Sequence, residues 1–179
     1  MGYSTYFFGE FIITPEIKDI HKKYINAFSR TRRNVKNTEK LSCIPDPLRE
    51  AVGLPLGKEG EFSLIEDICD IPGDLLIEGA PEGSYYAQWI INKNGNLCWN
   101  GGEKFYGYKH WLYYYIKKFF IPWGYKVNGR IRYKGEDSSD KGYITIKNNF
   151  IKNYPYSESD LRRFKLQGVI DDEKTMGND

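Results

Sequence analysis

Three carboxylates close together form the first candidate site for chemistry. Glu136, Asp137 and Asp140 lie within one short stretch, Gly135-Glu136-Asp137-Ser138-Ser139-Asp140. Carboxylate oxygens are the ligands that Mg²⁺ and Ca²⁺ prefer, so this stretch is a candidate metal site. Its spacing does not follow an EF-hand loop, and Asp and Ser are common in turns because they hydrogen-bond their own backbone. We therefore expect a solvated turn, with a metal-dependent hydrolase as the enzymatic alternative.

Basic side chains at every second position form the second candidate site. Over 125–134 apolar residues alternate with the polar positions that hold Lys126, Arg130, Arg132 and Lys134. In a strand, this pattern places apolar side chains on one face and cations on the other. Such a face could follow a phosphate backbone, or it could simply keep an exposed strand soluble. A second basic cluster that could contact phosphate consists of Arg30, Arg32 and Arg33.

Aromatic side chains would complete a nucleic-acid site if they lay beside these cations. RNA-binding sheets stack bases on aromatic rings that project from their open face. The N-terminal stretch 3–8 offers two alternating pairs, either Tyr6 and Phe8 or Tyr3 and Phe7. The sequence does not decide which pair faces outward, and the usual RNA-recognition signature is absent.

A protein-binding surface is the third candidate site. Residues 59–82 contain eight acidic residues and no Lys or Arg, which is typical of a surface that docks on a basic groove or of a solvated loop. Aromatic and His side chains on the polar side of a predicted helix suit an interface too, although a thick aromatic core is the alternative. The predicted partner-binding residues are Glu66, Asp67, Asp70, Asp74, Tyr106, His110 and Tyr113.

Several kinds of chemistry are disfavoured by what the sequence lacks. The three Cys and two His residues are not closely paired, which argues against a zinc site and a Cys-His catalytic pair. There is no glycine-rich phosphate loop, no G-x-S-x-G and no H-E-x-x-H, so we expect no cofactor and no enzymatic activity. The net charge is +2, and neither a membrane-spanning run nor a secretory signal is present. We expect a cytoplasmic protein with no membrane partner.

The elements that must position these residues predict an α+β fold. We expect a strand over 3–14 interrupted near Gly9, a helix from Pro15 to Ser29 and a hairpin over 84–99 closed by an Asn-Gly turn. A helix over 103–121 ends before Pro122, and strands follow at 125–134, 143–147 and 150–154. This order matches a ferredoxin-like βαββαβ plait with a C-terminal hairpin, whose antiparallel sheet carries two helices on one face.

The predicted domain organisation is one α+β domain over 1–155 and a C-terminal tail over 156–179. An irregular acidic insertion over 30–82 follows the first helix, with one short helix near 62–69. The tail has a short amphipathic segment over 161–166. The second face of the sheet would be covered by the insertion, by a partner or by water.

The string 98–106 (CWNGGEKFY), followed by PWGY at 122–125, Asn128-Gly129 and GED at 135–137, resembles small proteins of unknown function carried by phages and mobile elements. The resemblance covers less than a third of the chain, and residues 30–82 fall outside it. It implies that the matching residues are mostly caps, turns and core aromatics. It also implies a phage setting, in which small accessory proteins often act by binding.

These observations lead to one preferred function and two alternatives. We expect a non-enzymatic binding protein, a phage-encoded inhibitor of a host defence component that acts by protein–protein contact. The first alternative is a nucleic-acid-binding protein that uses the basic strand face. The second is a nucleotide- or signal-binding, sponge-like protein with a phosphate pocket between the sheet and the insertion. The oligomeric state is left open.

Overall fold

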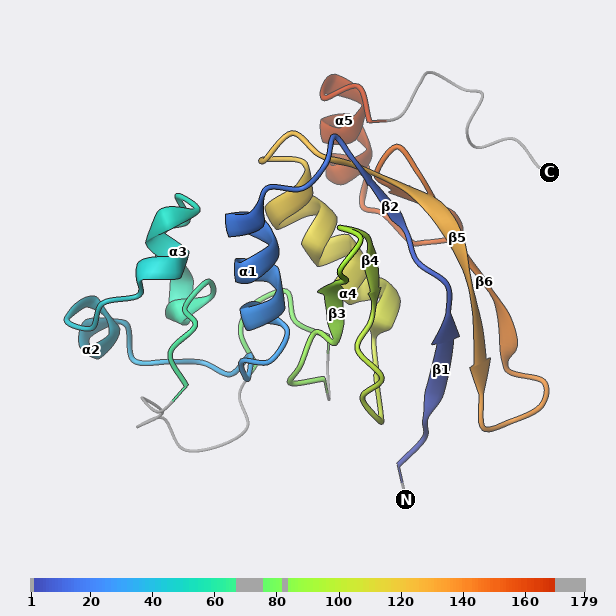
Figure 1. The fold of residues 1–179 in the computed structure, drawn as a ribbon, viewed down its shortest axis with the longest axis horizontal. Coiled ribbons are helices and arrows are strands. Elements are labelled where there is room, and N and C mark those ends of the chain that lie inside the picture. The colour runs from blue at the N-terminus through green and yellow to red at the C-terminus, as the bar shows by residue number, and fades with distance from the viewer. Residues whose placement is uncertain (1, 67–75, 82–83, 170–179) are drawn as a thin grey trace.

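The two ends of the chain together build a five-stranded antiparallel sheet (Figure 1). The computed structural model describes residues 2–66, 76–81 and 84–169. The strands of this sheet are β1 (Thr5–Phe8), β2 (Ile12–Thr14), β5 (Lys126–Gly135), β6 (Lys141–Lys147) and β7 (Phe150–Ile151). Their order is β1-β5-β6-β7, and β2 also pairs with β5. The long strand β5 therefore lies at the centre, between strands from both ends of the chain.

The predicted N-terminal strand is divided at Gly9, as expected from the sequence. Both halves keep the same register on β5, because Phe8 pairs with Arg132 and Ile12 pairs with Asn128. Gly9 has a φ of +112°, a backbone conformation that glycine adopts much more easily than other residues. At this residue the chain turns away from β5. Phe11 then exchanges two backbone hydrogen bonds of 2.8 and 2.9 Å with Leu97.

The predicted hairpin is confirmed, but it forms a two-stranded sheet of its own. It consists of β3 (Trp89–Ile91) and β4 (Leu97–Trp99), and Gly95 in its turn has a φ of +80°. The bridge between Phe11 and Leu97 links it to the N-terminal strands. The fold class is thus α+β as predicted, whereas the particular ferredoxin-like strand arrangement is not confirmed.

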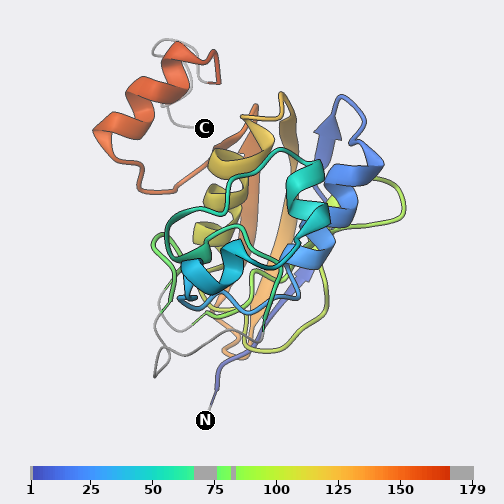
Figure 2. The same ribbon diagram turned by 90° about the vertical axis from the view of Figure 1, so that its left-hand side faces the viewer.

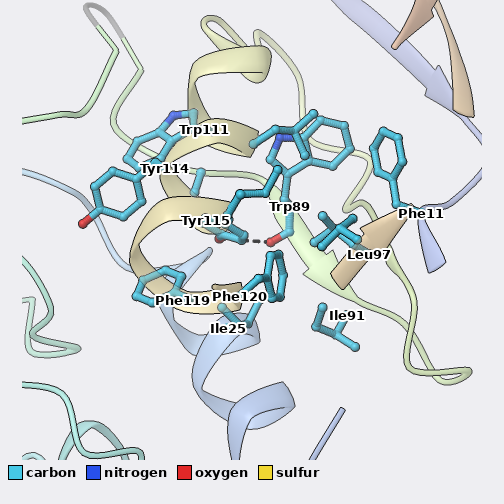
Figure 3. Close-up of a cluster of buried hydrophobic side chains, with 14 of the residues drawn as sticks. Phe11, Ile25, Trp89, Ile91, Leu97, Trp111, Tyr114, Tyr115, Phe119 and Phe120 are labelled. Atoms are coloured by element: carbon cyan, nitrogen blue, oxygen red, sulfur yellow. Dashed lines mark hydrogen bonds between the residues drawn. The ribbon is translucent and has the colours of Figure 1, made fainter. Parts of the chain in front are cut away.

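Two helical segments cover the inner side of this structure. They are α1 (Asp19–Phe28) and α4 (Tyr108–Tyr115), which continues without a break into the π-helical turn η2 (Ile116–Phe120). Apolar side chains from these segments meet the hairpin in the core shown in Figure 3, where the Tyr115 hydroxyl donates to the Trp89 carbonyl at 3.1 Å. The helix α4 begins later than predicted, because Gly107 is left-handed with a φ of +62°.

The described part of the insertion packs onto the helices, on the side away from the large sheet. Its described part contains α2 (Thr38–Ser42), α3 (Pro47–Ala51) and the single 3₁₀ turn η1 (Lys58–Gly60), so it is not irregular throughout. Figures 1 and 2 place these elements on the far side of α1 and α4 from the sheet. Phe62 enters the core, and residues 62–66 are not helical. The rest of the helix predicted near 62–69 lies outside the described residues.

The predicted amphipathic segment in the tail is the helix α5 (Glu158–Leu166). Ser157 caps its start by accepting a hydrogen bond from the backbone of Asp160. Phe164 is buried against Tyr113 of α4 and Tyr156. The first part of the tail is therefore docked on the domain. Within the described ranges, no helix has the length and apolar character needed to cross a bilayer.

Candidate functional site

The outward side of the large sheet carries both aromatic and cationic side chains. We call it the outer sheet face and define it by the exposed residues Tyr6, Phe8, Ile12, Lys126, Arg130, Arg132, Lys134, Lys141, Tyr143 and Lys147. The alternation predicted for 125–134 is confirmed, because Val127 and Ile131 of β5 point into the core. In Figure 1 this face looks away from all the helices labelled there, and α1, α3 and α4 lie on the opposite side of the sheet.

The aromatic pair on this face is Tyr6 and Phe8, while Phe7 between them is buried. The exposed fractions are 50% for Tyr6, 49% for Phe8 and 55% for Tyr143. Large aromatic side chains exposed to this extent on one surface are a feature of binding sites. The contribution of Tyr143 was missed from the sequence, although Lys141, Tyr143 and Lys147 repeat the same two-residue spacing as β5.

Strand pairing places aromatic and cationic residues in rows across the sheet. Arg132 pairs with Phe8 on one side and with Tyr143 on the other. In the next row, Lys134 pairs with Tyr6 and with Lys141. Because neighbouring strands lie about 4.8 Å apart, Phe8 and Tyr143 are roughly 10 Å from each other with a cation between them. In both of these rows, an aromatic ring lies directly beside a cation on the neighbouring strand.

Two guanidinium groups contact the rings on this face. The guanidinium carbon of Arg130 lies 3.6 Å from the centre of the Tyr143 ring, and that of Arg132 lies 5.0 Å from the centre of the Phe8 ring. Such cation–π contacts fix the position of both partners without removing them from water. The ring of Trp99 also meets that of Tyr6 edge-on, with centres 6.0 Å apart.

The cations of the outer sheet face have no carboxylate partner in the described part of the chain. The strands β1, β2, β5 and β6 contain no Asp or Glu. Among the described residues, no carboxylate forms an ion pair with the face cations, which are Lys126, Arg130, Arg132, Lys134, Lys141 and Lys147. An anion that approached this face would therefore not have to displace any carboxylate that the structure describes.

The candidate metal ligands lie in the turn between β5 and β6, where they bind other parts of the chain. Glu136 accepts a hydrogen bond from the backbone of Ser4 at 2.9 Å, and Asp140 accepts one from the Tyr3 hydroxyl at 2.7 Å. Asp137 accepts from the backbone and hydroxyl of Ser139, and these bonds lower the pKa of its carboxyl. No cluster of three possible metal ligands occurs in the described part of the chain.

The second basic cluster does not join the outer sheet face. Arg30 directly follows the C-cap of α1, a helix on the side of the sheet opposite the outer sheet face. The guanidinium of Arg32 lies 4.4 Å from the centre of the Tyr85 ring. Arg33 is only 1% exposed, and its guanidinium lies 4.1 Å from the centre of the Phe28 ring. Burial lowers the pKa of Arg33. The prediction that Arg33 contacts phosphate is therefore wrong, because the side chain is part of the core.

The predicted partner-binding residues are only partly available for contact. Glu66 is exposed and accepts a hydrogen bond from the backbone of Arg32, whereas Asp67, Asp70 and Asp74 lie outside the described residues. Tyr106 is exposed, and its hydroxyl accepts from the backbone of Tyr3.

The chain itself occupies the remaining part of that predicted interface. Tyr113 stacks on Tyr154 with ring centres 5.2 Å apart and also contacts Phe164. Nδ1 of His110 lies 3.2 Å from the Tyr154 hydroxyl. We expected Tyr113 and His110 on an open surface, but 154–164 packs against both.

No protein-family model, no curated protein and no solved structure matches this chain. The resemblance to phage proteins stays a prediction, and the case for a binding site rests on the geometry of the outer sheet face.

Proposed function

We propose that the protein binds nucleic acid through the outer sheet face. The observation that carries this proposal is the combination, on one side of a sheet, of half-exposed aromatic rings with six cations that pair with no carboxylate among the described residues. Of the functions expected from the sequence, this is the one that the described residues support best.

The two residue types on this face serve the two chemical parts of a polynucleotide. Cations that contact phosphates release bound counterions, which gives affinity that does not depend on sequence. Aromatic rings stack on bases, because every base has a π face. A need for solubility alone would account for the cations, but it would not account for the exposure of Tyr6, Phe8 and Tyr143 on the same side.

Two charge-matched double variants test this proposal. The variant Arg132→Gln/Lys134→Gln removes two cations from the outer sheet face, and Lys18→Gln/Lys23→Gln removes two exposed cations at α1 on the helical side. Fluorescence anisotropy with labelled oligonucleotides measures binding over a series of salt concentrations starting near about 50 mM. Circular dichroism checks that both variants are folded.

We expect the wild-type protein to bind, with an affinity that falls steeply as salt rises. The sheet variant should lose about tenfold or more in affinity and show a shallower salt dependence, by about 0.7 for each lost phosphate contact with a single strand. The helical-side variant should bind like the wild type. Absence of binding at low salt, or equal losses in the two variants, would refute the proposal.

A further inference from the structure

We infer that the ligand of the outer sheet face is an unpaired polynucleotide, with bases stacked on Tyr6, Phe8 and Tyr143 and phosphates held by Arg132 and Lys134. This inference rests on the proposed function and makes it more specific, because the cations alone would accept a duplex equally well. The rings, their spacing and the cation between them are the features that favour an unpaired strand.

An aromatic side chain can stack only on a base whose face is not already covered by a neighbouring base. In a duplex, each base is covered on both sides by neighbours at a rise of about 3.4 Å, so a side chain from a flat sheet cannot reach its π face. A duplex would contact the outer sheet face through its phosphates and leave Tyr6, Phe8 and Tyr143 without a function. Unpaired bases can turn toward the sheet and lie against these rings.

The spacing of the rings suits a strand with its bases unstacked. Tyr6 and Phe8 lie two residues apart on the same side of β1, which separates them by about 7 Å. This is about twice the base separation in a stacked helix, so two consecutive bases would each rest on a side chain and no longer on each other. The sheet is therefore expected to stretch the bound strand.

The cations are placed where the linking phosphates would lie. Arg132 is in register with both Phe8 and Tyr143, so a strand that crosses from β1 to β6 passes over its guanidinium. Lys134 is in register with Tyr6 in the neighbouring row. The guanidinium fork of Arg132 can bind a phosphate through two hydrogen bonds, whereas Lys134 acts as a point charge.

The guanidinium group of Arg130 stacks on the ring of Tyr143. Its guanidinium carbon lies at stacking distance from the Tyr143 ring, 3.6 Å from the ring centre. A planar guanidinium that rests on a ring can itself serve as a surface on which a base stacks. Because Lys keeps the charge of Arg but has no plane, Arg130→Lys separates stacking at this position from simple attraction to phosphate.

The test compares strands and rings at one salt concentration. The probes are fluorescently labelled oligouridine and oligodeoxyuridine of about twelve nucleotides, within the range of site sizes for single strands, and a duplex of the same length. The variants are Tyr6→Ala, Phe8→Ala, Tyr143→Ala and Arg130→Lys. Tyr86→Ala is the matched control, since Tyr86 is 42% exposed and lies outside the large sheet.

We expect each ring variant to bind the single strands about 5- to 100-fold more weakly with an unchanged salt dependence. Arg130→Lys should also weaken binding, and Tyr86→Ala should not. The duplex should bind at least about tenfold more weakly than the single strands. Binding of either single strand satisfies the inference, and the ratio between them identifies whether the ribose 2′-hydroxyl is read.

The two proposals fail in different ways. If the duplex binds as tightly as the single strands and the ring variants behave like the wild type, the inference is wrong while nucleic-acid binding stands. If none of the probes binds at low salt, the proposed function is wrong and the inference falls with it. Ring variants that retain the circular dichroism spectrum of the wild type exclude unfolding as the cause of lost binding.

Discussion

The outer sheet face and the helical side of the molecule use the same residue types in opposite ways. On the helical side, Arg33 lies over the Phe28 ring and is buried, and Tyr113 is packed under α5. On the outer sheet face, Arg130 lies over the Tyr143 ring and both remain exposed. The chain covers its helices with the insertion and α5, and no described segment covers the sheet.

This difference separates structural cations from cations that are available to a ligand. A buried cation is costly unless the protein replaces its water. Arg33 achieves this in part: its Nε and Nη1 donate to the backbone carbonyls of Thr31 and Glu61 at 2.9 and 3.3 Å, while its Nη2 has no hydrogen-bond partner among the described residues. Arg132 is exposed, and no carbonyl of the described residues accepts a hydrogen bond from its guanidinium. An arginine beside an aromatic ring therefore indicates a binding site only when both are exposed.

The largest expected contrast in stability is between two phenylalanines. Phe119 of η2 is fully buried and contacts the rings of Tyr24, Phe28 and Phe62, so Phe119→Ala should lower the free energy of unfolding by about 3–5 kcal/mol. Phe8→Ala on the outer sheet face should cost less than about 1 kcal/mol, the scale of a cross-strand pair. Urea denaturation of both variants measures this difference. Similar losses of unfolding free energy in the two variants would mean that Phe8 is a core residue, and the outer sheet face would then not differ from the helical side.

A smaller contrast is expected between two arginines. Arg33→Met should lower the free energy of unfolding by about 1–3 kcal/mol, because two buried carbonyls lose their donor. Arg132→Met should change it by no more than about 0.5 kcal/mol while weakening oligonucleotide binding and its salt dependence. Thermal unfolding and anisotropy on the same samples give both values. A strongly destabilised Arg132→Met would show that this cation holds the sheet together.

The smallest effect concerns acid and the docking of α5. Burial alone would raise the pKa of Asp160, but hydrogen bonds from Lys117, Ser157 and Tyr113 outweigh it and hold the pKa at about 2. When α5 is undocked, the carboxyl has its ordinary pKa near 3.8 and takes up a proton first. Docking is therefore fully stabilised above about pH 4 and weakens as the pH falls toward about 2.

Hydrogen exchange over 158–166 as a function of pH measures the docking of α5 directly. In Asp160→Asn, exchange relative to the intrinsic rate should be nearly independent of pH in this range, because the titrating group is gone. The strand β5 contains no Asp or Glu, so exchange in β5 serves as the internal control. A parallel loss of protection in both regions would mean that α5 and the sheet unfold together.

The parts of the fold that the sequence predicted are those specified by neighbouring residues. The hairpin around Gly95 and the two-sided strand β5 are confirmed, because an Asn-Gly turn and a two-residue alternation are local signals. The short helices α2 and α3 were missed, since five residues cannot show a helical stripe. The burial of Arg33 was missed as well, because its carbonyl partner Glu61 lies far along the chain.

The sequence by itself determined that β5 has one apolar side and one cationic side, because side chains in a strand must alternate. Only the tertiary structure decided which residues of other strands lie beside the cations of β5. Tyr6 and Phe8 join Lys134 and Arg132 across more than a hundred residues, and this register exists only once the two ends of the chain pair. The covering of Tyr113 by α5 was decided in the same way, by contacts between segments far apart in the chain.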